Sequence, residues 1–134
     1  MIKLFLLIFI MAIGSIDLET KLEARSKFQN QDFVFDLAGS QPATMGKAGT
    51  GQQVNVGNLP SLKGEGVSYT LFNIDPCGIN LPHVHPRATE IFFVIAGKFQ
   101  TTFSEENGGR TITNELSQGK ITFFPQGLIH EEVN

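Results

Sequence analysis

The chain of 134 residues has the length of one globular domain, with 41% hydrophobic and only 17% charged residues. This composition excludes a disordered chain, a collagen and a long coiled coil. The formal charge of -3 comes from 13 acidic and 10 basic residues without a basic cluster, so nucleic acid is not an expected partner. The lone cysteine, Cys77, excludes an intramolecular disulfide and a thiolate metal site.

The first 14 residues resemble a secretory leader in composition. Lys3 precedes an uninterrupted apolar run over residues 4–13, which is shorter than the roughly 20 residues that span a bilayer. Ala12 and Gly14 supply small residues for cleavage before Ser15. The sequence predicts a signal peptide over residues 1–14 and a secreted mature chain without a stable membrane span. An uncleaved membrane anchor and a buried first strand are the alternatives.

The segment that follows carries few structural signals. Residues 15–32 mix charged and scattered apolar side chains, which indicates an N-terminal arm with about two helical turns at most. Phe33 and Phe35 alternate with polar neighbours, so residues 32–37 are predicted to form a half-buried strand. Small polar residues and glycines over residues 38–53 predict a long loop.

The rest of the chain has the pattern of an all-β domain. Residues 90–96 are apolar on both faces, which indicates a strand enclosed in the core. Short strands separated by Gly, Pro, Asn and Asp turns favour an antiparallel sandwich or barrel. The expected strands are residues 66–74, 90–96, 98–103, 111–116, 120–124 and 128–133.

The three histidines and one glutamate occupy positions that suggest a metal site. In an extended segment, His83 and His85 project from the same face and can approach one centre. Glu90 begins the next strand, and His130 must come from a separate strand placed opposite. Three imidazoles and a carboxylate suit a divalent first-row metal, and an octahedral ion would keep about two open positions for water, substrate or dioxygen.

Taken singly, each of these residues has an ordinary explanation that involves no metal. A single histidine is more often a surface or hydrogen-bonded residue than a ligand, and the pair His83 and His85 is by itself weak evidence. The metal site is favoured because all three histidines of the chain fall into one pattern with a carboxylate. Manganese, iron, zinc, nickel and copper all accept such donors.

Two stretches of the sequence resemble the motifs of a known protein family. Residues 78–90, Gly-Ile-Asn-Leu-Pro-His-Val-His-Pro-Arg-Ala-Thr-Glu, followed after six intervening residues by Gly97, closely resemble the first cupin motif of germins and germin-like proteins. Residues 119–134 resemble the second motif at its full spacing, with Gly119, Pro125, Gly127, His130 and Asn134 in place. The resemblance covers residues 33–134, and the spherulin branch is the most similar because of the Phe-rich strands and the Glu-Asn-Gly-Gly-Arg turn.

The resemblance implies a secreted cupin, a double-stranded β-helix or jelly-roll barrel, over residues 33–134. It implies manganese, rather than iron or zinc, held by His83, His85, Glu90 and His130. Asn80 matches a motif asparagine beside the metal, where a dicarboxylate such as oxalate could be contacted; a plain turn residue is the alternative. Arg87 is expected to be structural rather than substrate-facing.

The implied activity is an oxidoreductase of the oxalate oxidase or superoxide dismutase type. A non-catalytic wall or cyst-coat protein stiffened by its metal is the first alternative, since one fold hosts many functions. A storage or sugar-binding module is ranked lower, because such relatives often lack the ligand set.

The sequence departs from the family at two places. Cys77 stands where the germin motif usually has a glycine. Family members continue beyond the second motif with further strands and with C-terminal helices that stabilise homo-oligomers, so the domain is expected to be truncated after Asn134. The strand that carries His130 is then expected to lack a partner on one side and to expose an edge.

Overall fold

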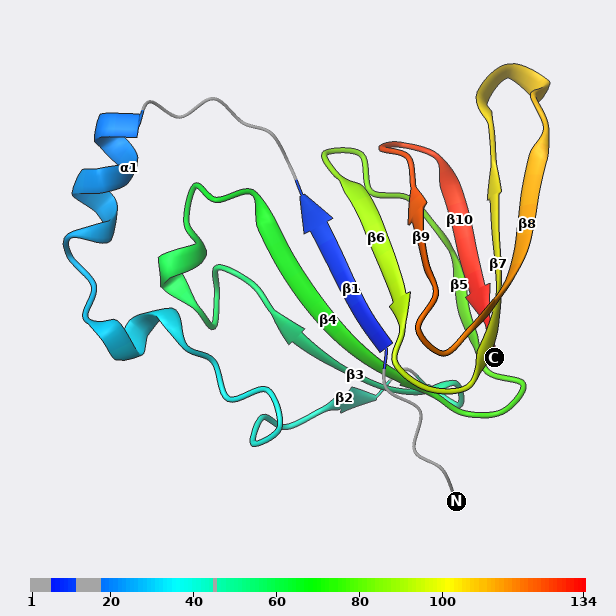
Figure 1. Ribbon diagram of the computed structural model, residues 1–134, viewed down its shortest axis with the longest axis horizontal. Coiled ribbons are helices and arrows are strands. Elements are labelled where there is room, and N and C mark those ends of the chain that lie inside the picture. The colour runs from blue at the N-terminus through cyan, green and yellow to red at the C-terminus, as the bar shows by residue number, and fades with distance from the viewer. Residues whose placement is uncertain (1–5, 12–17, 45) are drawn as a thin grey trace.

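The computed structural model describes residues 6–11, 18–44 and 46–134, and its strands form two antiparallel sheets (Figure 1). The first sheet has the strand order β2-β3-β4-β1-β6-β9, and the second has the order β5-β10-β7-β8. The helices of the described chain are α1 (Leu18–Arg25) and three short 3-10 helices, Asn30–Phe33, Pro60–Leu62 and Glu106–Gly108. The strands are β1 (Leu6–Met11), β2 (Ala43–Thr44), β3 (Gly49–Val54), β4 (Val67–Ile74), β5 (Ile79–His83), β6 (Thr89–Val94), β7 (Lys98–Ser104), β8 (Thr111–Ser117), β9 (Ile121–Phe124) and β10 (Ile129–Val133).

The hydrophobic core lies between the two sheets. The Phe92 ring meets the rings of Phe99 and Phe124 edge to face, with centroid distances of 5.5 Å and 6.0 Å. Such aromatic pairs add about 0.5–1.5 kcal/mol each beyond the area that they bury. The two facing antiparallel sheets confirm the predicted all-β jelly-roll. Members of the core from the first sheet are Ile74, Phe92, Val94 and Phe124, and those from the second are Phe99 and Leu116.

Strand β6 alternates more regularly than its sequence suggested. Phe92 and Val94 point into the core and are fully buried, whereas Ile91 and Phe93 on the opposite face are only half-buried. The prediction that both faces of this strand are enclosed is therefore wrong for the outer face. Glu90 shares the inner face with Phe92 and Val94, which places a carboxylate inside the barrel.

The predicted strand over residues 32–37 is wrong. The backbone N–H of Gln29 donates to the Asp32 carboxylate at 2.8 Å, and Asp32 N–H donates back to Gln29 O at 2.9 Å. These local bonds close a 3-10 turn over Asn30–Phe33, because a side chain that bonds to nearby backbone competes with strand pairing. Phe33 packs edge to face on Phe28 and stays half exposed, so its alternation with Phe35 does not mark a core face.

The predicted long loop over residues 38–53 is also wrong in part, because it contains β2 and β3. Strand β3 pairs with β4 from Gly49 opposite Ile74 to Val54 opposite Tyr69. A Cβ on Gly49 would overlap the carbonyl oxygen of Asn73, so glycine here permits a close approach of two strands. The pairing with β4, rather than strand propensity, makes this polar segment extended.

The N-terminal arm contains the short helix that its sequence allowed. Arg25 at the end of α1 donates through Nε and Nη2 to Glu65 Oε1, at 3.0 Å and 2.7 Å. The Arg25 hydrogen bond holds the pKa of Glu65 below its usual value. This ion pair ties α1 to the loop that precedes β4.

The apolar segment near the N-terminus forms a strand in the first sheet. Strand β1 lies between β4 and β6 and pairs with both, as the buried-strand alternative requires (Figure 1). The predicted cleavage site before Ser15 lies outside the described residues, so the signal peptide stays a prediction. Helices in the described ranges are all too short or too polar to cross a bilayer.

Strand β10 has a partner on each side, contrary to the expected open edge. It pairs with β5 through His130 opposite His83, and with β7 through His130 opposite Phe103. Asn134 is fixed as well, since its N–H donates to Gly78 O at 3.0 Å and its side-chain amide donates to Ile74 O at 2.7 Å. His130 therefore lies on an interior strand of its sheet, with a neighbouring strand on each side.

The turn that leads into β5 holds Cys77 in a strained conformation. Gly78 N–H donates to Asp75 O at 2.7 Å, and Cys77 at the third position of this turn has φ of 62°. Glycine favours this region because it has no Cβ, and a proline in second place, as Pro76 is, suits the same turn type. The departure at Cys77 from the germin motif thus coincides with a position that requires a positive φ.

Replacing Cys77 by glycine is expected to stabilise the protein. Relief of the left-handed strain, roughly 1–2 kcal/mol, exceeds the added chain entropy of glycine, so the free energy of unfolding should rise by about 0.5–1 kcal/mol. Urea denaturation measures this change. Cys77→Ala keeps the strain and should stay within about 0.5 kcal/mol of the parent; an equal gain in both variants would contradict the assignment.

Candidate metal centre

The four predicted ligands come from both sheets and one turn. His83 ends β5, His85 follows in the turn after it, Glu90 is the second residue of β6, and His130 is the second residue of β10. His83 and His130 are direct partners in the register of β5 and β10. His85 lies beyond the end of its strand, so the predicted shared strand face is not what brings it to the site. The turn over residues 84–88 does so instead.

The side chains of these residues converge on one carboxylate oxygen. Glu90 Oε2 lies 2.7 Å from His85 Nε2, 3.2 Å from His130 Nε2 and 3.9 Å from His83 Nε2. One donor atom from each of the four residues lies within 4.8 Å of the others. The structure therefore brings together all four residues that the sequence singled out.

Backbone carbonyls orient two of the imidazoles. His83 Nδ1 lies 2.8 Å from Leu81 O, and His130 Nδ1 lies 2.9 Å from Leu128 O. A carbonyl oxygen only accepts, so Nδ1 carries the proton in both rings. In the neutral ring this leaves the Nε2 lone pair directed at the centre, which is the usual arrangement of a metal-bound histidine and its outer hydrogen-bond partner.

The site is dry on its inner side. Glu90 and His130 are almost fully buried, with 1% and 3% of their surface exposed. The Phe124 ring stacks on the His130 ring at a centroid distance of 4.3 Å and an angle of 10°. This apolar wall strengthens electrostatic interactions at the centre, because it excludes water from one side of it.

Burial and mutual contacts set the protonation of the cluster. Burial alone would raise the pKa of Glu90, but hydrogen bonds from His130 and His85 outweigh it and hold the pKa below its usual value. Burial lowers the pKa of His83. For His130 burial would do the same, but the contact with Glu90 raises its pKa. Without a metal, the cluster therefore has an ionised carboxylate and favours the protonated form of His130, which donates from Nε2 to Glu90 and from Nδ1 to Leu128 O. A cation that binds here must displace the Nε2 proton, because the ligand is the neutral ring.

The residues present fit a divalent metal ion. Within the described chain, Glu90 Oε1 is buried without a hydrogen-bond partner, although buried carboxylate oxygens are normally satisfied. A cation at the convergence of the three Nε2 atoms and this carboxylate would satisfy that group. Three nitrogen donors and one oxygen donor suit manganese, iron, zinc, nickel or copper.

Asn80, predicted to lie on the substrate side, contacts a buried glutamate. Its side-chain N–H donates to Glu132 Oε2 at 2.9 Å, and the two residues face each other across β5 and β10. Glu132 is fully buried, and the sequence analysis missed it. Its position two residues after His130 could have revealed it, because alternate residues of a strand share a face.

Glu132 is a protonated acid in the folded protein at neutral pH. Burial, with the negative charge of Glu90 adding to its effect, raises the pKa of Glu132 to about 8. The group therefore adds no negative charge beside the cluster below that pH. Its Oε1 is buried without a hydrogen-bond partner in the described ranges.

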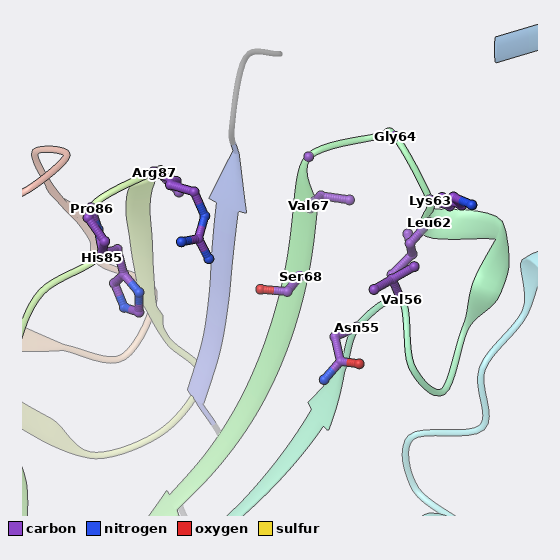
Figure 2. A pocket seen from close by; sticks show the side chains of 12 residues that line it. Asn55, Val56, Leu62, Lys63, Gly64, Val67, Ser68, His85, Pro86 and Arg87 are labelled. Atoms are coloured by element: carbon purple, nitrogen blue, oxygen red, sulfur yellow. The ribbon is translucent and has the colours of Figure 1, made fainter. Parts of the chain in front are cut away.

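A cavity of about 680 Å³ adjoins the metal cluster at His85. Arg87 and Ser68 line opposite walls, and their side chains point toward each other (Figure 2). Lys63 adds a second cation at the cavity. Across the described residues no carboxylate pairs with Arg87 or Lys63, so this cavity is positively charged next to a predicted ligand. Arg87, expected to be structural, therefore faces a cavity that reaches the site.

Glu132→Gln is expected to change how stability depends on pH in metal-free protein. Because the folded pKa of about 8 lies above the usual 4.5, the native state binds the proton more tightly. The contribution of Glu132 to the free energy of unfolding is fully present below pH 4.5. It is lost as the pH rises toward 8, at about 1.4 kcal/mol per pH unit.

The glutamine variant should lack this loss and gain stability over the parent by a few kcal/mol between pH 5 and 8. Thermal unfolding in a chelating buffer across that range measures the difference. Glu131→Gln removes a carboxylate from the same strand but from its other face, and it should keep the slope of the parent. If stability changed with pH in the same way in all three proteins, the raised pKa of Glu132 would be refuted.

Glu90→Gln is expected to weaken metal binding by at least about 100-fold, because it removes the only anionic donor of the cluster. Isothermal titration with Mn²⁺ and Zn²⁺ measures the affinity. Glu131→Gln, with the same change of charge, should bind as the parent does. Unchanged affinity in Glu90→Gln would remove this residue from the site.

Comparison with curated proteins gives relatives of about twice the length of this chain. Spherulin-1A of Physarum polycephalum is 41% identical over 116 residues, which cover 86% of this chain and 47% of the relative. A germin-like protein of Mesembryanthemum crystallinum is 37% identical over 110 residues, covering 77% of this chain and 46% of the relative. The chain thus spans about half the length of these curated relatives.

A solved oxalate oxidase structure shows the same fold. It superimposes with a TM-score of 0.70 at 23% identity and covers 94% of this chain and 66% of the oxidase chain. Residues 35–134 match the family described as "Cupin", which confirms the resemblance seen in the two motifs. Taken with the ligand cluster at the positions of those motifs, these matches show that the chain belongs to the cupin family.

Proposed function

We propose that this protein is a secreted, manganese-binding cupin of the germin-like type that acts as an oxidoreductase on a small anion, oxalate or superoxide. The observation that carries the proposal is the convergence of three Nε2 atoms on Glu90 Oε2 within a partly dry barrel. The germin-like relative and the oxalate oxidase fold support the same class. Extracellular location is proposed on the leader-like composition of residues 1–14.

His83, His85, Glu90 and His130 would hold the ion. Manganese, when bound, supplies two accessible oxidation states and open positions for small ligands. Glu90 offsets one unit of its charge, and the four side chains fix its place, since Leu81 O and Leu128 O prevent two of the rings from turning. Zinc would supply no redox change, which makes the identity of the metal decisive for the activity.

The cavity beside His85 is the entry for the anion. Arg87 points into this cavity and attracts negative charge (Figure 2), and such clefts raise the local concentration of an anion and its association rate. In the oxidase reaction, oxalate and dioxygen with two protons give two molecules of carbon dioxide and one of hydrogen peroxide. Asn80 donates one side-chain N–H to Glu132, and its proposed role is to position that acid.

A structural role is the second candidate, and the origin of the ligands favours it. Glu90 lies in the first sheet, whereas His83 and His130 lie in the second. An ion held by all three would cross-link the two sheets and stabilise the folded state by the free energy of its binding. A non-catalytic extracellular coat protein would need this effect alone.

The decisive assay uses the purified, manganese-loaded protein. Oxalate-dependent peroxide formation or superoxide consumption is expected in the parent and in Glu131→Gln, and at least about 100-fold less in Glu90→Gln. Thermal unfolding of the same samples reports the structural effect. If the parent and both variants lack activity while manganese still raises the melting temperature of the parent and of Glu131→Gln but not that of Glu90→Gln, the oxidoreductase proposal fails and the structural candidate stands.

A further inference from the structure

The cavity beside His85 is larger than the small anions of the proposed function require. Its volume of about 680 Å³ falls in the range of roughly 300–1,000 Å³ that drug-sized ligands fill, whereas oxalate consists of only two joined carboxylates. The described residues that line it lie between Asn55 and Ala88, so a chain cleaved before Ser15 retains them. The cavity therefore has room for a larger ligand.

One end of the cavity is polar and carries a cation. Arg87 and Ser68 point toward each other across it (Figure 2). Arg87 has no carboxylate partner among the residues that the structure describes. A guanidinium can bind a carboxylate through two parallel N–H groups, and a hydroxyl opposite it can donate a further hydrogen bond to the same group. This end of the cavity therefore suits a carboxylate.

The turn that carries Arg87 is held in place by the segment that leads into β10. The backbone N–H of Gly127 donates to His85 O at 3.0 Å, and the side-chain amide of Gln126 donates to Pro86 O at 2.9 Å. These bonds lie on either side of Arg87 in space and fix the backbone before it in the chain. A cation on a fixed turn loses less conformational entropy when it binds an anion.

The other end of the cavity is apolar. Val56, Leu62 and Val67 gather on the side of β4 that faces away from Arg87 (Figure 2). Val56 keeps 53% of its surface exposed, although it is an apolar residue. The loop is held by a turn in which Leu62 N–H donates to Leu59 O at 3.0 Å. A ligand with an apolar body would remove these side chains from water, which favours its binding.

We propose that this cavity is a binding site for a carboxylate that carries an apolar body, with the carboxylate at Arg87 and Ser68 and the body on Val56, Leu62 and Val67. The separation of charge from apolar surface within one cavity is the observation that carries the proposal. The site goes beyond the proposed function, because it needs neither a metal ion nor a redox step. An occupant would compete with a small anion for the cavity, a consequence that rests on the proposed function.

Straight-chain carboxylates test both ends of the site in the full chain. A chelating buffer keeps metal ions out of the histidine cluster, so that no ion can hold the carboxylate. Titration with acetate, butanoate and hexanoate, followed by nuclear magnetic resonance of the protein amides, gives the affinities. Each fully buried CH₂ group strengthens binding roughly fourfold, so hexanoate should bind at least about tenfold more tightly than acetate. Hexylamine has a body of the same length but the opposite charge, and it should not bind.

Two variants separate the two ends of the cavity. Arg87→Gln should weaken the binding of hexanoate at least about tenfold, because it removes the cation. Arg110→Gln is the matched control, since Arg110 is exposed and pairs with Glu105 in the hairpin of β7 and β8; it should bind as the parent does. Val56→Asn should weaken the binding of hexanoate at least about threefold and leave that of acetate unchanged.

No binding of hexanoate, equal affinities for acetate and hexanoate, binding of hexylamine, or an unchanged affinity in Arg87→Gln would each overturn the proposal. The amide spectra show whether each variant is folded. If Arg87→Gln is not folded, the chain-length series and hexylamine decide. Failure of the proposed oxidoreductase activity would leave these results standing, because the titration uses metal-free protein.

Discussion

The packing of the two sheets against each other is the constraint on which the meeting of three imidazoles at one buried carboxylate depends. Glu90 belongs to one sheet, and His83 and His130 belong to the other, so the cluster exists only when the sheets face each other in register. The aromatic core that holds the sheets together is therefore also what assembles the site. Phe124 joins the two, since its ring packs on Phe92 in the core and on His130 in the cluster.

Much of the site follows from spacing, because metal ligands impose strict requirements on residue type and position. His130 could be assigned to the same centre as His83 although 47 positions separate them, since the second motif predicts a strand there. The protonation of Glu132 could not be foreseen in the same way. It depends on how completely the barrel buries that carboxyl and on its distance from Glu90, which no local pattern encodes.

The errors in the predicted fold share one physical cause, because the pattern of residue types does not show where the backbone hydrogen bonds of a segment go. Phe33 and Phe35 alternate as in a strand, but Asp32 bonds to the backbone of its own turn; Gly49 begins a strand only because β4 lies close beside it. The expected open edge at His130 was wrong for a related reason. Strand β10 finds partners in β5 and β7, which come from distant parts of the chain, so both of its edges are paired.

The most direct test of the central claim is X-ray absorption spectroscopy of the manganese-loaded full chain. The account predicts a first coordination shell with three imidazole nitrogens and one carboxylate oxygen from the protein, completed by about two light ligands, and the outer-shell scattering that imidazole rings produce. A shell made of oxygen alone, or one with fewer than two imidazoles, would contradict the account.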